Sequence, residues 1–326
     1  MSLRLKQPGA LPASSAADER RKARGGGILL VLLFLLLANA NAVFAGNLLQ
    51  RLHPFTFLFW SFLSCSLFFL GRLALQGREA LAISGKVMVP LVVVNCTTAL
   101  NWIGYYFALR FVEPAIVSAI MGGVGPLFMI LMERFYFRRL FSALVWGAAF
   151  GVLAGTCLLV WASLFGHSGL KVYNYAGMLV GLSAALAGGA SQALNTLATK
   201  QLGIRGWNAG QIMAHRFYLL ILCALVLALQ GPGLAVPLSW TLVGVVLSTL
   251  MGVIVPLWVL QRGILLSDPF IVAALLSLAP IIAYLFQGMD SRLSWSGVSL
   301  AGCLIVVVFT ICSVVVKHKE TRNEQA

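Results

Sequence analysis

Polar side chains inside long apolar stretches are the candidate ligand-binding residues of this sequence. Arg216 is the one basic residue well inside such a stretch, about eight residues from its nearer polar end. An arginine at the centre of a membrane helix costs roughly 2.5–3.5 kcal/mol, so a function or a buried partner should accompany it. Its guanidinium could hold a carboxylate or phosphate through two parallel hydrogen bonds. The alternative is that the side chain extends to the membrane interface and serves only as an anchor.

Uncharged polar and aromatic side chains accompany this arginine in other apolar stretches. In one stretch they recur at helical spacing on the face that holds Thr98. Together they predict a hydrogen-bonding cavity with aromatic walls; the alternative is hydrogen bonding between helices, worth roughly 0.6–2 kcal/mol per contact. The predicted substrate-binding residues are Asn39, Asn95, Trp102, Tyr106, Gln192, Asn195, Arg216 and Tyr284.

Two further titratable residues are candidates for gating or coupling. Glu133 ends a predicted helix, where its charge opposes the helix dipole, and the arginines just after it offer a purely structural explanation. His215 precedes Arg216 and faces a different direction on the helix. No carboxylate lies in the middle of any predicted span, which disfavours a deep carboxylate relay. Exchange, facilitated efflux and a histidine-linked step stay open.

Glycine and proline interrupt two of the apolar stretches at matching depths. One contains Gly122, Gly123, Gly125 and Pro126, and the other contains Pro280. Proline removes a backbone hydrogen bond, so helix breaks are expected at both places. Paired interruptions of this kind are a sequence signal of a transport site, although small residues also allow close helix packing.

Membrane-spanning helices are the elements predicted to carry these residues. The 326 residues are 60% hydrophobic and only 10% charged, with a mean hydropathy of +0.94. Soluble chains are nearer half apolar and a quarter charged. Windows of about 20 apolar residues predict ten spans, at 27–47, 54–75, 87–109, 114–133, 140–162, 174–199, 208–230, 238–261, 269–288 and 295–316.

The basic residues indicate how these spans are oriented. Eighteen Lys and Arg residues lie on the side of the termini and four lie on the opposite side. Basic loops stay cytoplasmic, so both termini are predicted to be cytoplasmic and the protein to lie in an inner, cytoplasmic membrane. This distribution also explains the net charge of +14 without nucleic acid as a partner.

An internal repeat appears at an offset of 155 residues. Glu113-Pro114 corresponds to Asp268-Pro269, and Ser61-Phe62 corresponds to Arg216-Phe217. Five spans in each half reverse the direction of the second copy, which is a common transporter arrangement. The predicted fold is therefore an all-α membrane protein with ten transmembrane helices in two inverted five-helix repeats around a central cavity. Its segments are a disordered basic cytoplasmic tail (1–25), the first repeat (27–162), a periplasmic linker (163–173), the second repeat (174–316) and a cytoplasmic tail (317–326).

Other classes of function find little support in the sequence. The six cysteines lie in apolar stretches without metal-ligand spacing, and no P-loop, nucleophile elbow or carboxylate pair is present. We therefore expect no enzyme activity, no catalytic residue, no metal and no cofactor. A scaffold or an intramembrane enzyme is a remote alternative.

The acid-proline pairs, the prolines at 126 and 280, Glu133 and Arg216-Phe217 resemble the drug/metabolite transporter superfamily, specifically its EamA-type ten-helix exporters. The resemblance covers residues 28–316. It implies a central cavity between the repeats and the outward movement of small polar metabolites such as amino acids. Three departures are Ser61 in place of a first-half arginine, Gln287 in place of a second-half acid, and Leu37-Ala38-Asn39 in place of a Trp-Gly pair.

We therefore expect a secondary transporter that exports a small polar or zwitterionic, amino-acid-like metabolite by alternating access. Import, exchange or facilitated diffusion of the same substrate is the alternative, because rocking is reversible. The expected partners are the small-molecule substrate and the lipid bilayer, and both a monomer and a homodimer stay open.

Overall fold

The chain folds as a bundle of helices. The computed structural model describes residues 13–77, 81–135, 138, 141–267 and 269–324, with some side chains in these ranges, including those of Pro126 and Glu133, outside the description. Within these ranges there is no strand, and the only sheet-like contact is an isolated antiparallel bridge between Leu170 and Leu293. The predicted all-α class is confirmed.

The first half of the chain forms five helices whose starts follow local capping rules. Pro54 and Pro114 each stand at the first helical position, where a missing N–H removes no hydrogen bond. Ser142 caps the fifth helix by accepting a hydrogen bond from the backbone of Val145. The helices are α1 (Ala13–Leu48), α2 (Pro54–Ala74), α3 (Met88–Phe111), α4 (Pro114–Phe135) and α5 (Ala143–Leu164), with a 3-10 turn η2 (Gly85–Val87) before α3.

The second half contains shorter pieces. Two predicted spans are divided, one at Arg216–Phe217 and one at Ser277–Leu278, and a third contains a turn of π-helix. The pieces are α6 (Tyr175–Ile204), α7 (Ala209–His215), α8 (Tyr218–Gln230), α9 (Trp240–Leu247), the π-helix η3 (Ser248–Ile254), α10 (Val255–Leu266), α11 (Pro269–Leu276), α12 (Ala279–Phe286), the 3-10 turn η4 (Gln287–Met289) and α13 (Gly297–Glu324).

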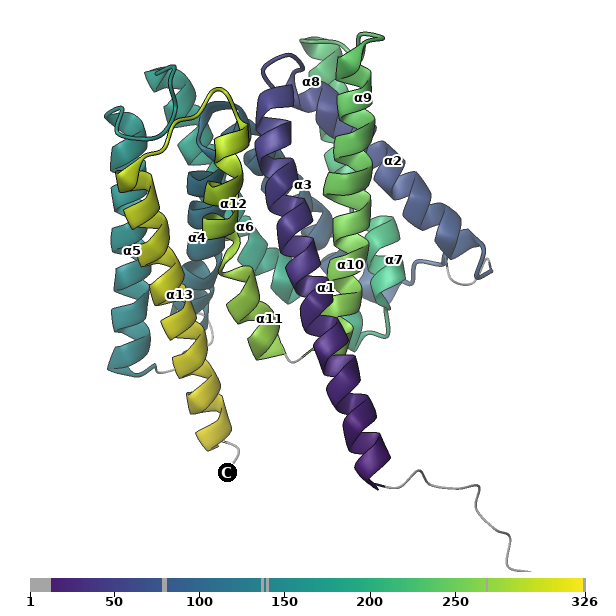
Figure 1. Cartoon of the computed structure of the whole chain (residues 1–326). Coiled ribbons are helices and arrows are strands. Elements are labelled where there is room, and N and C mark those ends of the chain that lie inside the picture. The colour runs from purple at the N-terminus through teal and green to yellow at the C-terminus, as the bar shows by residue number, and fades with distance from the viewer. Residues whose placement is uncertain (1–12, 78–80, 136–137, 139–140, 268, 325–326) are drawn as a thin grey trace, which may run out of the picture.

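Nine helices within the described ranges are long and apolar enough to cross a membrane. They correspond to nine of the ten predicted spans. The remaining one, predicted at 269–288, consists of α11 and α12, each of eight residues and too short to cross alone. Figure 1 shows α12 continuing in the direction of α11, so that the two together extend through the bundle.

Three expectations about helix boundaries are wrong. α1 begins at Ala13 and α13 continues to Glu324, so parts of both predicted tails are helical. The extension of α1 is rich in alanine and arginine and that of α13 in lysine and glutamate, all of which favour helix. α4 is also continuous over Pro114–Phe135, without the break predicted at Gly122–Pro126. Packing explains this continuity, because a Cβ at Gly123 would meet Val152 and Val306, and neighbouring helices can hold a proline-containing helix straight.

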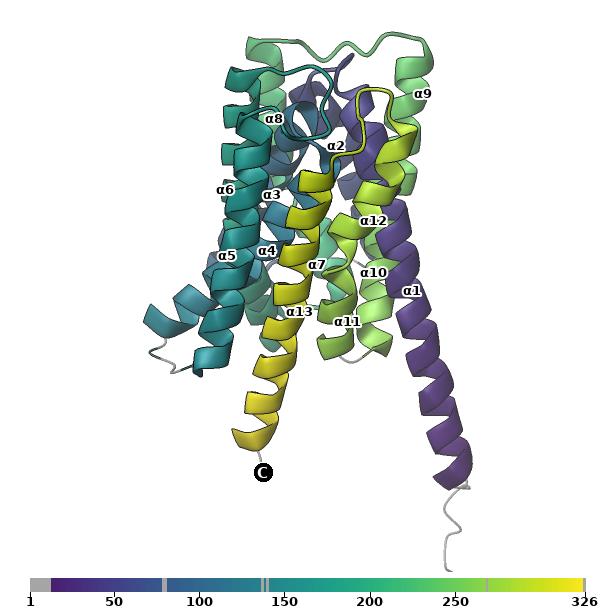
Figure 2. The ribbon, with the colours of Figure 1, turned by 60° about the vertical axis from the view of Figure 1, so that its left-hand side comes forward.

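The two halves pack against each other through a reciprocal set of helix pairs. α3 packs along α6, and α1 packs along η3 and α10; α4 contacts α6, and α12 contacts α1. α5 and α13 form a further pair at one edge of the bundle (Figure 2). First-half and second-half helices therefore alternate across the interface, as two interlocked units would.

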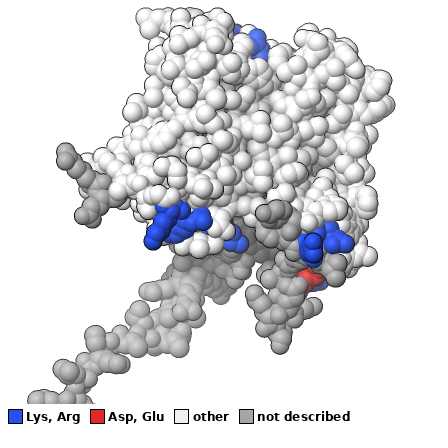
Figure 3. Space-filling model, turned by 180° about the vertical axis from the view of Figure 1, so that it is seen from behind, with Lys and Arg blue, Asp and Glu red and all other residues white. Residues whose placement is uncertain are grey.

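Both chain ends point to the same end of the bundle (Figure 1). We call the opposite end, which carries the loops 49–53, 165–174 and 287–296, the distal end. In the view of Figure 3, lysine and arginine side chains gather near the end that holds the termini, and one small group lies at the other end. The multi-pass topology and the helix directions agree with the charge distribution in the sequence.

Candidate substrate-binding site

The break between α7 and α8 brings Arg216 into the interior of the bundle. α7 ends at His215 and α8 begins at Tyr218, so backbone groups around the break lack their helical partners. Asn95 of α3 is the hydrogen-bond partner of two of these backbone groups. Its amide donates to the carbonyl of His215 (2.9 Å), and its oxygen accepts from the N–H of Leu219 (3.2 Å). Asn95 therefore satisfies two backbone groups that the helix break would leave without partners at this depth.

The guanidinium of Arg216 is held by uncharged groups. Its Nε and Nη2 donate to the hydroxyl of Thr98 at 3.3 and 3.2 Å, and Nη2 also donates to the Asn195 oxygen at 2.9 Å. Nη1 contacts only the sulfur of Met213, at 3.8 Å, among the described residues. No carboxylate of the described residues forms an ion pair with Arg216. The protein therefore orients this cation without neutralising it.

Asn195 of α6 links Arg216 to α3. While its oxygen accepts from Arg216, its amide nitrogen lies 2.9 Å from the hydroxyls of both Thr97 and Thr98. The side chain of Asn195 is thus engaged on both sides, and its orientation is fixed. Three helices, α3, α6 and α7, meet at this Arg216 site.

Aromatic rings cover one side of the Arg216 site. Phe62 of α2 packs against Phe217 (5.2 Å between ring centroids) and against Trp102 (4.9 Å). Trp102 in turn stacks on Tyr106 at 5.9 Å. Two of the predicted residues, Trp102 and Tyr106, therefore form an aromatic wall that begins beside Arg216 and extends toward the distal end.

The corresponding place in the other half of the bundle is uncharged. Asn41 of α1 accepts a hydrogen bond from Ser248 at 2.7 Å, and Ser61 of α2 shares one with Thr249, also at 2.7 Å. Offsets of 154 or 155 residues relate Asn41 to Asn195 and Ser61 to Arg216. The same helix positions are therefore polar in both halves, but only one carries a cation.

Three of the predicted substrate-binding residues lie apart from the Arg216 contacts. Asn39 is buried, donates to the carbonyl of Leu35 and accepts a 3.4 Å hydrogen bond from Ser118. Gln192 is exposed, one turn before Asn195 on α6. Tyr284 lies near the distal end, where its hydroxyl donates to the carbonyl of Ser296 (2.8 Å). The side chain of Glu133 lies outside the described residues.

His215 faces away from the Arg216 site. Its Nδ1 lies 2.6 Å from the hydroxyl of Tyr218, and its ring packs on Trp207 at 5.3 Å. Its Nε2 is buried without a hydrogen-bond partner among the described residues. The histidine is 3% exposed, so it belongs to the packed wall of the helix break.

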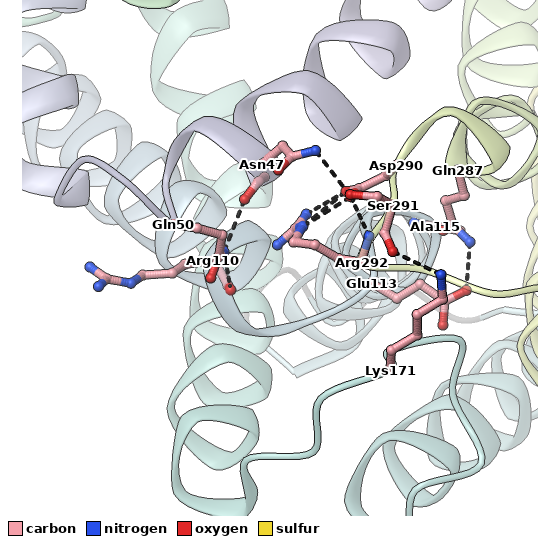
Figure 4. A network of polar contacts seen from close by, with 11 residues as sticks. Asn47, Gln50, Arg110, Glu113, Ala115, Lys171, Gln287, Asp290, Ser291 and Arg292 are labelled. Carbon is pink, nitrogen blue, oxygen red and sulfur yellow. Dashed lines mark hydrogen bonds and ion pairs between the residues drawn. The ribbon is translucent and has the colours of Figure 1, made fainter. Parts of the chain in front are cut away.

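A second polar cluster lies at the distal end (Figure 4). Glu113 accepts a hydrogen bond from Gln287 at 2.6 Å, which Figure 4 shows. It also accepts from Ser299 (2.8 Å) and from the backbone of Gly169 (2.9 Å). Gln287 also accepts from the backbone of Ala115. The cluster joins the start of α4 to the linker, η4 and α13, and so connects the two halves.

Burial dominates the electrostatics of this cluster. Removal from water raises the pKa of Glu113, and the hydrogen bonds from Gly169, Gln287 and Ser299 act in the opposite direction without cancelling the rise. Nearby, Arg292 forms an ion pair with Asp290 at 2.7 Å, and Asn47 of α1 also donates to Asp290. The distal end is thus fastened by polar contacts that satisfy one another, whereas the charge of Arg216 is unpaired among the described residues.

Sequence reasoning missed several of these residues. Thr97 and Phe62 carry no pattern that marks them as binding residues, and Thr98 gave only its helical spacing. Glu113 was visible in the acid-proline pair of the repeat, but its contact with Gln287 connects residues 174 positions apart. Among the described residues no group of three or more His, Cys, Asp or Glu side chains could hold a metal ion.

Comparisons with known proteins agree with this architecture. Residues 25–161 match the model of the EamA-like transporter family. No curated protein matches the sequence significantly. A solved structure, described only as "Crystal structure of protein", is 15% identical and superposes with a TM-score of 0.63 over 91% of this chain and 99% of the other. At that identity the likeness supports the fold alone.

Proposed function

Because this chain, through residues 25–161, belongs to the EamA-like transporter family of the drug/metabolite transporter superfamily, we propose that it exports a small polar or zwitterionic metabolite with an anionic group, such as an amino acid. The observation that carries the proposal is the Arg216 guanidinium, held at a helix break by the uncharged Thr98 and Asn195.

The charge balance of the site favours an anionic ligand. A cation at membrane depth costs free energy that neutral hydrogen-bond acceptors do not recover fully. A substrate carboxylate would supply the missing charge and accept from the N–H groups that Thr98 and Asn195 do not use. The same two residues fix the guanidinium before the substrate arrives, which reduces the entropy cost of binding.

The aromatic wall suggests how the rest of the substrate is held. Trp102, which is partly exposed, packs on the fully buried Phe62, and Phe62 packs on the fully buried Phe217 beside Arg216. A carboxylate on Arg216 and an apolar or aromatic group on this wall would together orient one molecule. Tyr106 on α3 and Gln192 on α6 are candidates for contacts with the polar end of the substrate.

Alternating access fits the way in which the halves meet. The reciprocal helix pairs support two inverted repeats, and the cluster around Glu113 supports a state in which the distal end is closed. Opening that end would require the Glu113 contacts to Gln287 and Ser299 to break. Breaks at Arg216–Phe217 and Ser277–Leu278 offer hinges for such a motion.

The direction of transport depends on the orientation of the protein. With its basic end in the cytoplasm, as the positive-inside rule expects, the protein would lie in an inner membrane and expel its substrate through the distal end. Import, exchange or facilitated diffusion would use the same site, because the substrate gradient decides the direction.

Counterflow in proteoliposomes tests the proposal. A panel of labelled amino acids and related carboxylates is offered to vesicles loaded with the unlabelled compound. We expect uptake of at least one labelled carboxylate. The same compound without label should compete for this uptake, and its unlabelled amide should not. Arg216→Leu should abolish the uptake and leave the protein inserted and folded.

The matched control is Arg262→Leu. Arg262 is exposed and packs over Trp258 (4.5 Å), away from the Arg216 contacts. This variant should transport normally. Equal uptake by wild-type and Arg216→Leu vesicles would contradict the assigned role of Arg216, and absence of uptake for every compound would contradict transport of this substrate class.

A further inference from the structure

A long apolar groove lies between α1, α9 and α12, away from the Arg216 site. It has a volume of about 720 Å³. Its walls include Phe44 from α1, Val243 and Leu247 from α9, and Met289 from the turn after α12, all of them exposed. The groove therefore follows a boundary between a first-half helix and two second-half helices.

This groove faces lipid, not water. Its walls belong largely to the membrane-spanning segments 25–48 and 240–260. From Leu37 to Leu48, the helical residues of α1 that line it, the helix rises eleven residues, or about 16.5 Å, and Arg51 follows in the turn after the helix. A hydrocarbon core of about 30 Å gives each leaflet about 15 Å, so the groove spans one leaflet from its middle to the interface.

A cation without a protein partner stands at the interfacial end of the groove. Among the described residues no hydrogen bond or ion pair engages the Arg51 side chain, which is exposed. Two other cations at the distal end are occupied, since Arg292 pairs with Asp290 and Lys171 donates to the carbonyl of Ser291. Arg51 is thus available to a ligand at headgroup level.

Trp240 marks the same level on the opposite wall. It begins α9, lines the groove and is 83% exposed. Tryptophan is favoured at the membrane interface, where its ring lies among the headgroups. Polar side chains in the walls are already used within the protein, because Asn41 accepts from Ser248 and Asn47 donates to Asp290.

We propose that this groove binds one anionic phospholipid of the distal leaflet, with an acyl chain between α1 and α9 and the phosphate on Arg51. The length of the groove fits one leaflet and its walls fit a hydrocarbon chain. Its cation, unpaired among the described residues, lies where a phosphate would be. A lipid held here contacts both halves of the bundle and joins them at the distal end. The inference does not depend on transport.

Quenching by brominated lipid tests the proposal directly. Purified protein is placed in phosphatidylcholine vesicles that contain increasing fractions of dibrominated phosphatidylglycerol. The difference in fluorescence between the wild type and Trp240→Phe isolates the Trp240 contribution. We expect this contribution to be quenched at mole fractions well below those that quench the remaining tryptophans, because a bound lipid is retained next to it.

Two variants assign the parts of the site. Arg51→Gln should raise the mole fraction for half-quenching of Trp240 about fivefold, the effect of one cation on an anionic lipid. Arg51→Lys should restore most of the affinity. Ala40→Leu, which fills the groove from α1, should also reduce early quenching. Arg110→Gln is the matched control, because Arg110 lies at the same end but does not line the groove.

The outcomes separate a site from ordinary lipid contact. Quenching of Trp240 that follows the bulk mole fraction and is unchanged in Arg51→Gln would overturn the proposal. An equal effect of Arg110→Gln would show a general surface charge effect and would also overturn it. If Arg51→Gln does not elute as folded protein, the Arg51→Lys and Ala40→Leu results decide.

Discussion

The two polar sites related by the sequence offset differ in one charge and one helix break. At the Arg216 site, Asn195 and Thr98 hold a guanidinium beside the junction of α7 and α8. At its counterpart, Asn41 accepts from Ser248, Ser61 shares a hydrogen bond with Thr249, and α2 is continuous. Both sites are hydrogen-bonded crossings of helices. The proposed function depends on the charge and the helix break that only the Arg216 site has.

The two sites show the difference between polar residues that stabilise the fold and a polar residue that can bind a ligand. Ser61 and Thr249 satisfy each other, which stabilises the crossing and needs no ligand. Arg216 has more donors than its neighbours have acceptors, and its charge has no partner in the described part of the chain. A site that is incomplete without a ligand is a better candidate for binding than one that is complete.

The strongest test removes the asymmetry. Arg216→Ser copies the counterpart and deletes the charged hydrogen bonds, each worth about 1.5–3 kcal/mol, so counterflow should fall roughly 10- to 100-fold. Size-exclusion elution and thermal unfolding should change little, because the cost of burying the charge disappears with it. Retained counterflow would show that the two sites are functionally equivalent.

The reverse exchange tests the other side of the comparison. Ser61 is fully buried beside Thr249, so Ser61→Arg places a cation where no described carboxylate lies within hydrogen-bond reach of Ser61. We expect a loss of about 2.5–3.5 kcal/mol in stability, seen as a lower unfolding temperature in detergent. Ser61→Ala is the control for the lost hydroxyl. Normal stability of Ser61→Arg would indicate a counterion or a route to water at the counterpart site.

Asn95 and Thr249 provide a comparison of helix support. Asn95→Leu leaves the His215 carbonyl and the Leu219 N–H without partners, at about 1–3 kcal/mol each. Thr249→Val removes one hydroxyl contact and should cost about 0.5–1.5 kcal/mol. Thermal unfolding of both variants measures the difference. Equal losses would mean that Asn95 does not support the break.

Local sequence signals predicted where helices begin, and less well where they break. Pro54, Pro114 and Pro269 mark three helix starts, because proline at the first position is satisfied by the chain itself. Gly122 to Pro126 gave the strongest signal for a break, yet α4 is continuous there. Helix α5 and helix α13 pack on Gly123, and such support cannot be seen in the sequence of α4 alone.

The break at Arg216–Phe217 is the opposite case. His215, Arg216, Phe217 and Tyr218 include no glycine or proline, so nothing local predicts an interruption. It is maintained by Asn95, which is 120 residues away from His215. Arg216 could be predicted as a site residue from the sequence because a cation in an apolar stretch is costly. Its contacts with Thr98 and Asn195 could not, because they depend on how three helices meet.

Glu113 gives a smaller and pH-dependent test at the distal end. Its pKa is raised in the folded protein, so its contribution to stability is complete below the unfolded pKa and is lost as pH rises through the folded pKa. Glu113→Gln should remove this loss. Unfolding temperatures from about pH 4 to pH 8 should therefore fall more in the wild type than in the variant. Parallel curves would mean that Glu113 ionises without cost.

The smallest expected effect concerns His215, which precedes Arg216 at the helix break. The contact between its Nδ1 and the Tyr218 hydroxyl should be worth about 0.5–1.5 kcal/mol, measured by a double-mutant cycle of His215→Gln and Tyr218→Phe. Within the described spans His215 is the only histidine, and imidazole titrates near neutral pH. If His215 couples transport to protons, counterflow should lose its pH dependence between about pH 5.5 and pH 8 in His215→Gln and keep it in Tyr218→Phe. An unchanged pH profile, together with the expected coupling energy, would make His215 a packing residue of the break and leave Arg216 as the single functional difference between the two sites.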